Sequence, residues 1–279
     1  MFRSKIANLS ALVASLAIAG QSYGDPFIQY GFDYTSGTVQ DHGSVINDAN
    51  PGTFNSGSIR RGNGGTYTSD IPTNTQFTTG IGSLDTSTGA FRTGTGATSG
   101  EGVVSYSDIV GAGGLTMEAW AKGGNNGLIL SIAGAYNIAG AANGYRVFNG
   151  FRELTDFVAV EMDRSEWTHL ALVMANPFFN DADDLVADLM FYVNGVHVGT
   201  FEASNFPKLN DLTRGLAVGD HPLSIVTTVS FHGLIYEPRI SLGALTPDQF
   251  TIVIPEPASL ALIGLGAGLL LTRRRVSNN

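Results

Sequence analysis

Three carboxylates lie within six positions of one another and are the residues whose spacing could support catalysis. They are Glu161, Asp163 and Glu166 in the run EMDRSE. Two carboxylates that flank a glycosidic bond can hydrolyse it, one as the nucleophile and the other as the acid and base, when their carboxyl groups lie about 5–5.5 Å apart. The spacing Glu-x-Asp-x-x-Glu, placed on a bulged strand, is a pattern that can present such a pair. A glycoside hydrolase or lyase that uses these three residues is therefore one hypothesis.

The residues between these carboxylates argue against catalysis. A catalytic strand needs apolar residues at the alternate positions, because those positions face the core. Here they include Arg164 and Ser165, which prefer solvent. Glu166 also leads directly into Trp167, the start of an apolar strand. We therefore predict that Arg164-Ser165-Glu166 is part of a solvated hairpin turn and that the protein is not an enzyme, with the hydrolase or lyase as the alternative.

A second acidic cluster could bind a cation. Asp181, Asp183 and Asp184 lie in the run NDADDLVAD, which we predict to be a loop. Calcium takes six to eight oxygen ligands, and acidic loops supply them, although this run lacks the spacing of an EF-hand. We expect any bound cation to be Ca²⁺ at these aspartates. The alternative is a solvated acidic loop without a metal.

The remaining residue types add few candidates. The chain has no cysteine, which excludes disulfides and Cys-ligated metals. Its five histidines show no HExxH or paired metal spacing, and His169, within an apolar strand, is predicted to be an interior histidine. Several aromatic residues fall in predicted loops: Tyr136, Tyr145, Phe148, Phe151, Phe178 and Phe179. Sugar-binding faces use such rings, but loop aromatics also pack locally.

These residues must be positioned by a sheet protein. The chain has 36 glycines and only 14% charged residues. Its short β-rich runs are separated by turn residues, as in an antiparallel sandwich. The clearest turn is Asn194-Gly195, which predicts a two-residue type I′ hairpin. Along Trp167–Met174 both alternating faces are largely apolar, so this run is predicted to be an inner strand covered on both sides.

Several pieces occur in an order that resembles a known family. They are IQYGFDYTSGTVQDHGS (28–44), LTMEAWAKG (115–123), EWTHLALVM (166–174), LMFYVNGVHVG (189–199), LAVGD (216–220) and FHGLIYEPRISLGALTPDQF (231–250). The ordered set resembles a laminin G-like domain of the concanavalin A-like superfamily. The resemblance implies an all-β fold over residues 25–250, an antiparallel two-sheet jelly-roll sandwich. It also implies that the last of these strands lies beside the N-terminal strand.

The N-terminal segment is predicted to be a secretory signal peptide over residues 1–24. Arg3 and Lys5 form its positive region, and Ala11–Ala19 forms its apolar helix. Ser22 and Gly24 supply the small residues at positions −3 and −1, so we predict cleavage after Gly24, with Ala19 as the alternative. The chain is therefore expected to be exported.

The C-terminal segment, residues 251–279, is predicted to hold a membrane helix. Ala258–Leu271 carries no charge and is fourteen residues long. As a helix it would span about 21 Å, which is short for a bilayer. Three basic residues follow at once, in the pattern of a stop-transfer signal: Arg273, Arg274 and Arg275.

The same segment resembles a PEP-CTERM sorting signal. The residues that carry the resemblance are Pro255, Glu256 and Pro257, followed by the apolar helix and the arginine cluster. The resemblance implies that the tail holds the protein transiently in the inner membrane. An exosortase-type membrane transpeptidase then cleaves near the motif and transfers the protein to the cell surface or extracellular matrix.

The charge of the exported part limits its partners. Five of the 15 basic residues lie at the two ends of the chain, Arg3, Lys5 and Arg273–Arg275, and all 24 acidic residues lie between them. The stretch between Lys5 and Arg273 therefore has 10 basic residues and a net charge of −14. Such a charge repels nucleic acid and permits divalent cations. We therefore expect an exported, non-catalytic protein of the surface or exopolysaccharide that binds glycan or protein or acts as a matrix scaffold. A purely structural matrix protein without a specific ligand is a further possibility.

Overall fold

The computed structural model describes residues 26–33, 35, 38–41, 58–59, 66–87, 91–92, 106–132, 136–149, 157–203, 216–219 and 231–253. The predicted signal helix and the predicted terminal membrane helix lie outside these residues. Within them, helix is limited to α1 (Tyr106–Gly111) and the short 3₁₀ turn η3 (Pro247–Gln249). No helix of the described residues has the length and apolar character needed to cross a membrane.

The larger of two antiparallel sheets has nine strands. Seven of them follow the order β14 (Val196–Ala203), β13 (Leu185–Val193), β12 (Thr168–Phe179), β7 (Gly114–Gly123), β16 (Gly233–Leu242), β1 (Pro26–Asp33) and β2 (Thr38–Asp41). The other two extend from β16, which pairs with β5 (Ser83–Asp85), and β5 in turn pairs with β4 (Thr66–Thr68).

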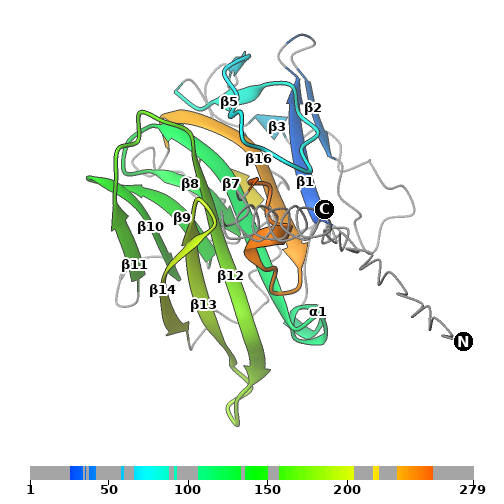
Figure 1. The fold of residues 1–279 in the computed structure, drawn as a ribbon. Coiled ribbons are helices and arrows are strands. Elements are labelled where there is room, and N and C mark those ends of the chain that lie inside the picture. The colour runs from blue at the N-terminus through cyan, green and yellow to red at the C-terminus, as the bar shows by residue number, and fades with distance from the viewer. Residues whose placement is uncertain are drawn as a thin grey trace, which may run out of the picture.

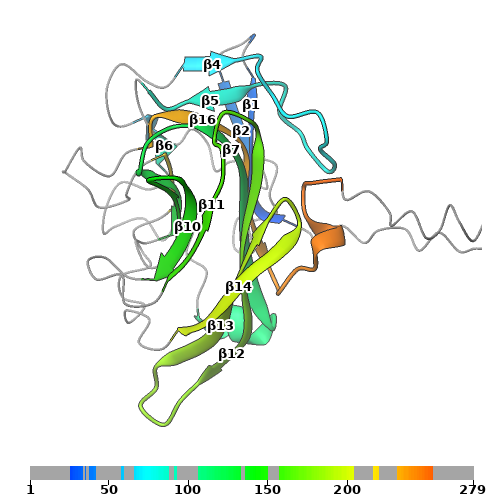
Figure 2. The ribbon, with the colours of Figure 1, turned by 60° about the vertical axis from the view of Figure 1, so that its left-hand side comes forward.

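The smaller sheet has seven strands and faces the larger one, as Figures 1 and 2 show. Its order is β11 (Phe157–Glu161), β10 (Gly144–Asn149), β9 (Tyr136–Ala141), β8 (Leu128–Ile132), β15 (Leu216–Val218), β6 (Phe91–Arg92) and β3 (Ser58–Ile59). The fold is therefore the predicted all-β class, two antiparallel sheets packed as a jelly-roll sandwich.

Two local predictions of strand pairing are confirmed. Asn194 and Gly195 join β13 to β14 with φ angles of 49° and 75°, the left-handed conformation that a type I′ turn requires. Strand β16 lies between β7 and β1, with Gln29 opposite Arg239. The last strand of the resemblance therefore lies beside the N-terminal strand, as expected.

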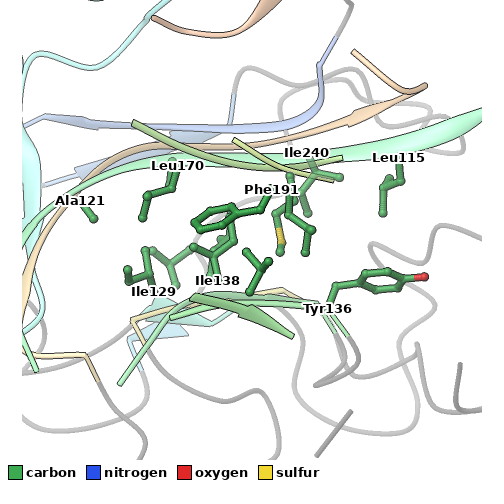
Figure 3. Packing of buried hydrophobic residues seen from close by; sticks show 14 of the residues in the cluster. Leu115, Ala121, Ile129, Tyr136, Ile138, Leu170, Phe191 and Ile240 are labelled. Carbon is green, nitrogen blue, oxygen red and sulfur yellow. The ribbon is translucent and has the colours of Figure 1, made fainter. Parts of the chain in front are cut away.

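The main core lies between the two sheets and follows from the alternation of side chains along each strand. On β12, Leu170 and Leu172 point inward, and on β8 Ile129 points toward them. Figure 3 shows Leu170 and Ile129 with Phe191 and Ile138 filling the space between the sheets. Their burial from water supplies the largest stabilising contribution to a fold without disulfides.

A second, smaller core lies on the outer face of the larger sheet. Ala171 and Val173, the alternate residues of β12, are fully buried there beside Trp120. Residues 244–253, which we call the strap, cover this face with Leu245, Phe250 and Ile252. Figure 2 shows the strap in orange, on the side of the larger sheet away from β10 and β11. From Thr168 to Ala175, strand β12 is thus buried on both faces, as predicted for this run.

Candidate functional site

The run EMDRSE forms a turn that passes from one sheet to the other. Glu161 ends β11 in the smaller sheet, and β12 of the larger sheet begins at Thr168. Asp163 closes the turn, because its carboxylate accepts hydrogen bonds from the Ser165 amide at 2.8 Å and the Ser165 hydroxyl at 2.7 Å. These two hydrogen bonds lower the pKa of Asp163. A lowered pKa suits a carboxylate that closes a turn, whereas a general acid needs a raised pKa.

The rest of this turn is fixed to the neighbouring loop. Arg164 donates from Nη1 to the carbonyl of Asn125 at 2.8 Å, and its own carbonyl accepts from the Gly123 amide. Glu161 and Glu166 are both exposed, at opposite ends of this connection. A turn is present at Arg164–Glu166, but it is not the predicted hairpin turn, because the strands on either side of it belong to different sheets. The arrangement is a fixed crossover between sheets rather than a strand that presents two carboxylates to a substrate.

The acidic run forms the turn of the β12–β13 hairpin, and its shape is set by one side chain. The Asn180 amide oxygen accepts from the Ala182 and Asp184 backbone N–H groups, each at 2.9 Å. Asp181 and Asp183 are exposed, and Asp183 has a positive φ of 61°. In the described part of the chain no group of three or more His, Cys, Asp or Glu residues could hold a metal ion. Calcium at these aspartates therefore stays a prediction.

Two exposed aromatic residues, Phe178 and Phe179, end strand β12 beside this turn. The loop prediction is therefore wrong for them, as it is for Tyr136, Tyr145 and Phe148, which lie in β9 and β10, and Phe151 lies outside the described residues. Phe178 is 53% exposed and Phe179 is 41% exposed, where β12 carries a bulge before them. The bulge begins near Asn176, whose φ is 52° and whose amide donates to Asp188 at 3.0 Å. Figures 1 and 2 show the hairpin reaching beyond the neighbouring strands at the end opposite β5. We call residues 176–184 the hairpin tip, a projecting surface of phenyl rings and carboxylates.

A buried charged cluster on the outer face of the larger sheet was not predicted. Glu118 of β7 pairs with Arg239 of β16 and contacts His169 of β12 at 2.7 Å between Oε2 and Nε2. All three residues are fully buried. His169 is thus an interior histidine with a hydrogen-bond partner, as expected from its apolar strand.

The charge state of Glu118 follows from these contacts. Burial alone would raise the pKa of Glu118, but the Arg239 guanidinium and the hydrogen bonds from His169 and Thr251 outweigh it. The pKa of Glu118 is therefore lowered, and the carboxylate is ionised at neutral pH. A buried carboxylate of this kind must keep its partners, because an uncompensated buried charge is strongly destabilising.

The strap supplies part of this compensation. The Thr251 amide donates to Glu118 Oε2 at 2.9 Å, and Arg239 Nη2 donates to the Gln249 carbonyl at 2.7 Å. Near the start of the strap, the Leu245 amide donates to the Thr116 hydroxyl at 2.9 Å. The strap is thus hydrogen-bonded to the buried charges as well as packed on the apolar residues around them.

A neighbouring loop holds the end of the strap from its other side. The Gln76 amide donates to the Thr251 carbonyl and the Val253 amide donates to the Asn74 carbonyl, both at 2.9 Å. Thr75 and Ile252 lie opposite each other as an isolated antiparallel bridge. Residues 74–76 and 251–253 therefore form a short two-stranded ladder.

This loop is itself fixed by a second buried carboxylate. Glu237 lies in a bulge of β16 with a φ of 46° and accepts from the Thr79 amide at 2.6 Å, the Gly80 amide, and Gln29 Nε2 at 2.9 Å. Burial raises the pKa of Glu237 in spite of these hydrogen bonds. Glu237 thereby connects β16 and β1 to the loop that holds the strap.

The strap leads directly to the predicted sorting motif. Val253 is the last described residue, and Pro255, Glu256, Pro257 and the three terminal arginines lie outside the described part of the chain. One residue, Ile254, separates the end of the ladder from the motif. Sequence reasoning identified the motif but not the fixed segment before it.

Comparisons with known structures return sandwich domains at low identity. The chain has 9% identity and a TM-score of 0.48 to the binding domain of botulinum neurotoxin serotype D/C, over 81% of this chain and 50% of that one. It has 18% identity and a TM-score of 0.35 to a heptameric SAP-like pentraxin from Limulus polyphemus, over 49% and 67%. It has 14% identity and a TM-score of 0.34 to the CBM40 module of a Ruminococcus gnavus IT-sialidase, bound to α2,3-sialyllactose, over 49% of this chain and 79% of that one.

These scores carry no information on ligand or activity, and the chain spans half the length of the neurotoxin domain it matches. No curated protein sequence matches the chain. The comparison with protein families returns a match at the C-terminal end, over residues 253–275. This match is to the PEP-CTERM protein-sorting motif, so the chain carries that motif at the end of the strap, with Val253 common to both.

Proposed function

We propose that the protein is an exported, non-catalytic binding or matrix protein that an exosortase-type membrane transpeptidase sorts through its C-terminal signal. The observation that carries the proposal is the sorting motif at residues 253–275, which begins where a folded sandwich ends. The tail holds the protein transiently in the inner membrane, with Arg273–Arg275 on the cytoplasmic side. Processing near Pro255-Glu256-Pro257 then transfers the domain to the cell surface or exopolysaccharide.

Host cells that lack the exosortase-type enzyme test this proposal. We expect full-size protein to accumulate in their inner membrane, whereas cells with the enzyme carry a shorter form at the surface. An epitope tag in the exposed β9–β10 turn at Ala142 would follow the protein without touching the strap. Normal size and normal surface amount in cells without the enzyme would contradict the proposal.

The non-catalytic part of the proposal is supported by the geometry of the EMDRSE turn. Glu161 and Glu166 are exposed ends of a connection that Asp163 and Arg164 fix in place. We expect the purified domain, with or without Glu161→Gln, to leave polysaccharides intact. Cleavage that is lost in Glu161→Gln without loss of folding would instead favour the hydrolase or lyase.

We place the binding function at the hairpin tip. Phenyl rings pack against the C–H faces of sugars, and carboxylates accept hydrogen bonds from sugar hydroxyls, so a neutral glycan suits the exposed Phe178, Phe179, Asp181 and Asp183. The negative charge of the domain disfavours anionic polymers. A protein ligand would use the same rings.

A glycan array with residues 25–253 tests the hairpin tip. Phe178→Ala with Phe179→Ala should lower array signals by about tenfold or more, the equivalent of about 1.4 kcal/mol. Val196→Ala, at a residue that is 64% exposed on β14, is the matched control and should leave them unchanged. Absence of any signal for the unaltered domain would favour a matrix scaffold without a glycan ligand.

Calcium at the same tip is tested separately. We expect any cation that this domain binds to be Ca²⁺ at these aspartates, so any heat from titration of CaCl₂ should be lost in the Asp181→Asn, Asp183→Asn variant, because carboxylates are the preferred calcium ligands. Absence of calcium-dependent heat in the unaltered domain would leave the tip as a solvated acidic turn closed by Asn180.

A further inference from the structure

We propose that the strap stays docked on the domain while the sorting enzyme acts, so that the enzyme meets the motif together with the adjacent face of the domain. This inference rests on the proposed function and adds a structural requirement to it. The alternative is that the strap peels away to give the motif a flexible tether. If the strap stays docked, the enzyme must bind the motif beside the folded domain and the mature protein keeps the whole strap. If the strap is released, the enzyme binds a flexible segment and can cut within the strap.

The length of chain after the strap is the first argument. The Val253 amide is hydrogen-bonded to the Asn74 carbonyl at 2.9 Å, which fixes this residue to the domain. Two residues of extended chain span at most about 7 Å, so the Cα atom of Pro255 can lie no further than that from the Cα atom of Val253. With the strap docked, an enzyme that reaches the motif must therefore contact the domain.

The contacts of the strap are the second argument. Phe250 and Thr251 are fully buried and Ile252 is 3% exposed. Release would expose their apolar surface and would remove the Thr251 hydrogen bond from the ionised Glu118. Loss of a hydrogen bond to a buried charge is strongly unfavourable in free energy, so both packing and electrostatics oppose release of the strap. The Phe250 ring adds contacts with His169 and Tyr192, at centroid distances of 5.5 and 5.3 Å.

The character of the adjacent face is the third argument. Residues 73–76 and 244–253 contain a single charged side chain, that of Asp248, which is exposed. Asn74 is exposed as well, and Val253 is 42% exposed. A nearly uncharged face can approach a membrane-embedded enzyme closely, because few charges must lose their water.

The ladder offers a direct way to lock the strap. Thr75 and Ile252 lie opposite each other, and the hydrogen bonds of this ladder run between the residues on either side of them. Such a non-hydrogen-bonded pair has Cα atoms about 4.5 Å apart, within the range that a disulfide accepts. The chain has no cysteine of its own, so a Thr75→Cys, Ile252→Cys variant can form one intramolecular bond. Beyond the inner membrane the environment permits it.

The experiment follows processing of the full chain in its host. We expect the doubly substituted, oxidised protein to be shortened and to reach the surface in the same proportion as the wild-type protein, within about twofold. The single variants Thr75→Cys and Ile252→Cys control for lost packing. Full-size protein that accumulates in the membrane only when the disulfide is formed would overturn the proposal.

A second measurement needs no variant. The C-terminal peptide of the mature surface protein, read by mass spectrometry, should end at Ile254 or later, because the enzyme acts beyond the docked strap. An end at Val253 or earlier would overturn the proposal.

Failure of the proposed function looks different. A variant with alanine at Pro255, Glu256 and Pro257, run on the same gel, should remain full-size. If it is shortened and exported normally, the sorting function fails, whatever the locked strap does.

Discussion

Thr251 donates its backbone N–H to the carboxylate of Glu118 at 2.9 Å, across 133 positions of the chain and at a site where both residues are fully buried. The contact joins the last packed segment of the sandwich to a charge in the middle of its larger sheet. It gives the buried Glu118 carboxylate a hydrogen-bond donor in addition to Arg239 and His169. It also fixes the point at which the chain leaves the domain toward its sorting motif.

The Glu118–Arg239 pair is predicted to be strongly coupled. Glu118→Gln leaves the Arg239 guanidinium buried without its counter-charge and should lower the free energy of unfolding by about 3–5 kcal/mol. Arg239→Met should lower the free energy of unfolding by a similar amount, because it leaves the Glu118 carboxylate buried without its counter-charge. The double variant should be destabilised by clearly less than the sum. Urea unfolding of residues 25–253 measures all four proteins, and additive losses would show that the two residues are not coupled.

The acid dependence of stability should reflect the lowered pKa of Glu118. In the unfolded chain this carboxyl has a pKa near 4.5, and in the folded protein its pKa is lower. As pH falls below 4.5, the unfolded chain takes up the proton first, so the free energy of unfolding falls until the folded pKa is reached. Unfolding curves from pH 6 to pH 2 should therefore show a shallower acid decline in Glu118→Gln. An unchanged slope would contradict the assignment.

Glu237 should act with the opposite sign in a different pH window. Burial raises its folded pKa above 4.5. At pH values between the unfolded pKa of 4.5 and the higher folded pKa, the folded protein binds the proton more tightly than the unfolded chain does. This residue therefore adds to the free energy of unfolding as pH falls toward 4.5. Glu237→Gln should remove that gain, which the same unfolding curves would detect above pH 4.5. If the free energy of unfolding still rises in the Glu237→Gln variant as pH falls toward 4.5, another titratable group is responsible for the rise.

The strap should carry much of the stability of the outer core. Phe250→Ala removes a fully buried ring and should lower the free energy of unfolding by about 3–5 kcal/mol. Val253→Ala, three residues later and 42% exposed, is the matched control and should change it by less than about 0.5 kcal/mol. Thermal or urea unfolding compares them. Equal effects would mean that the strap is not part of the folded core.

Much of the sandwich could be predicted because its signals are local. Asn194-Gly195 requires a left-handed turn, and the two apolar faces of residues 167–174 require cover on both sides of the strand. The hairpin at Asn194-Gly195, the inner strand and a turn at Arg164–Glu166 follow from such patterns, but the passage of that turn from one sheet to the other does not. The laminin G-like assignment, the domain limit at residue 250 and the signal peptide stay predictions.

The strap and its charged cluster could not be predicted, because they depend on contacts between distant segments. Within LTMEAWAKG, the alternation of the strand predicts an outward-facing, solvated Glu118. Only the fold shows that Arg239, His169 and Thr251 lie beside it. Thr251 and Ile252 lie beyond the predicted domain limit, yet both are buried. One signal was available: the strand needs cover on its outer face, and the apolar residues of the run ALTPDQFTIV can supply it.

The size and location of a protein in which Pro255, Glu256 and Pro257 are replaced by alanine test the central claim most directly. With the Ala142 tag, fractionation should find the substituted protein at full size in the inner membrane, because insertion needs only the apolar helix and the arginines whereas processing needs the extended triplet. The wild-type protein should be shorter and at the surface. If the substituted protein reaches the surface at wild-type size and amount, the claim is contradicted and a plain C-terminal anchor replaces it.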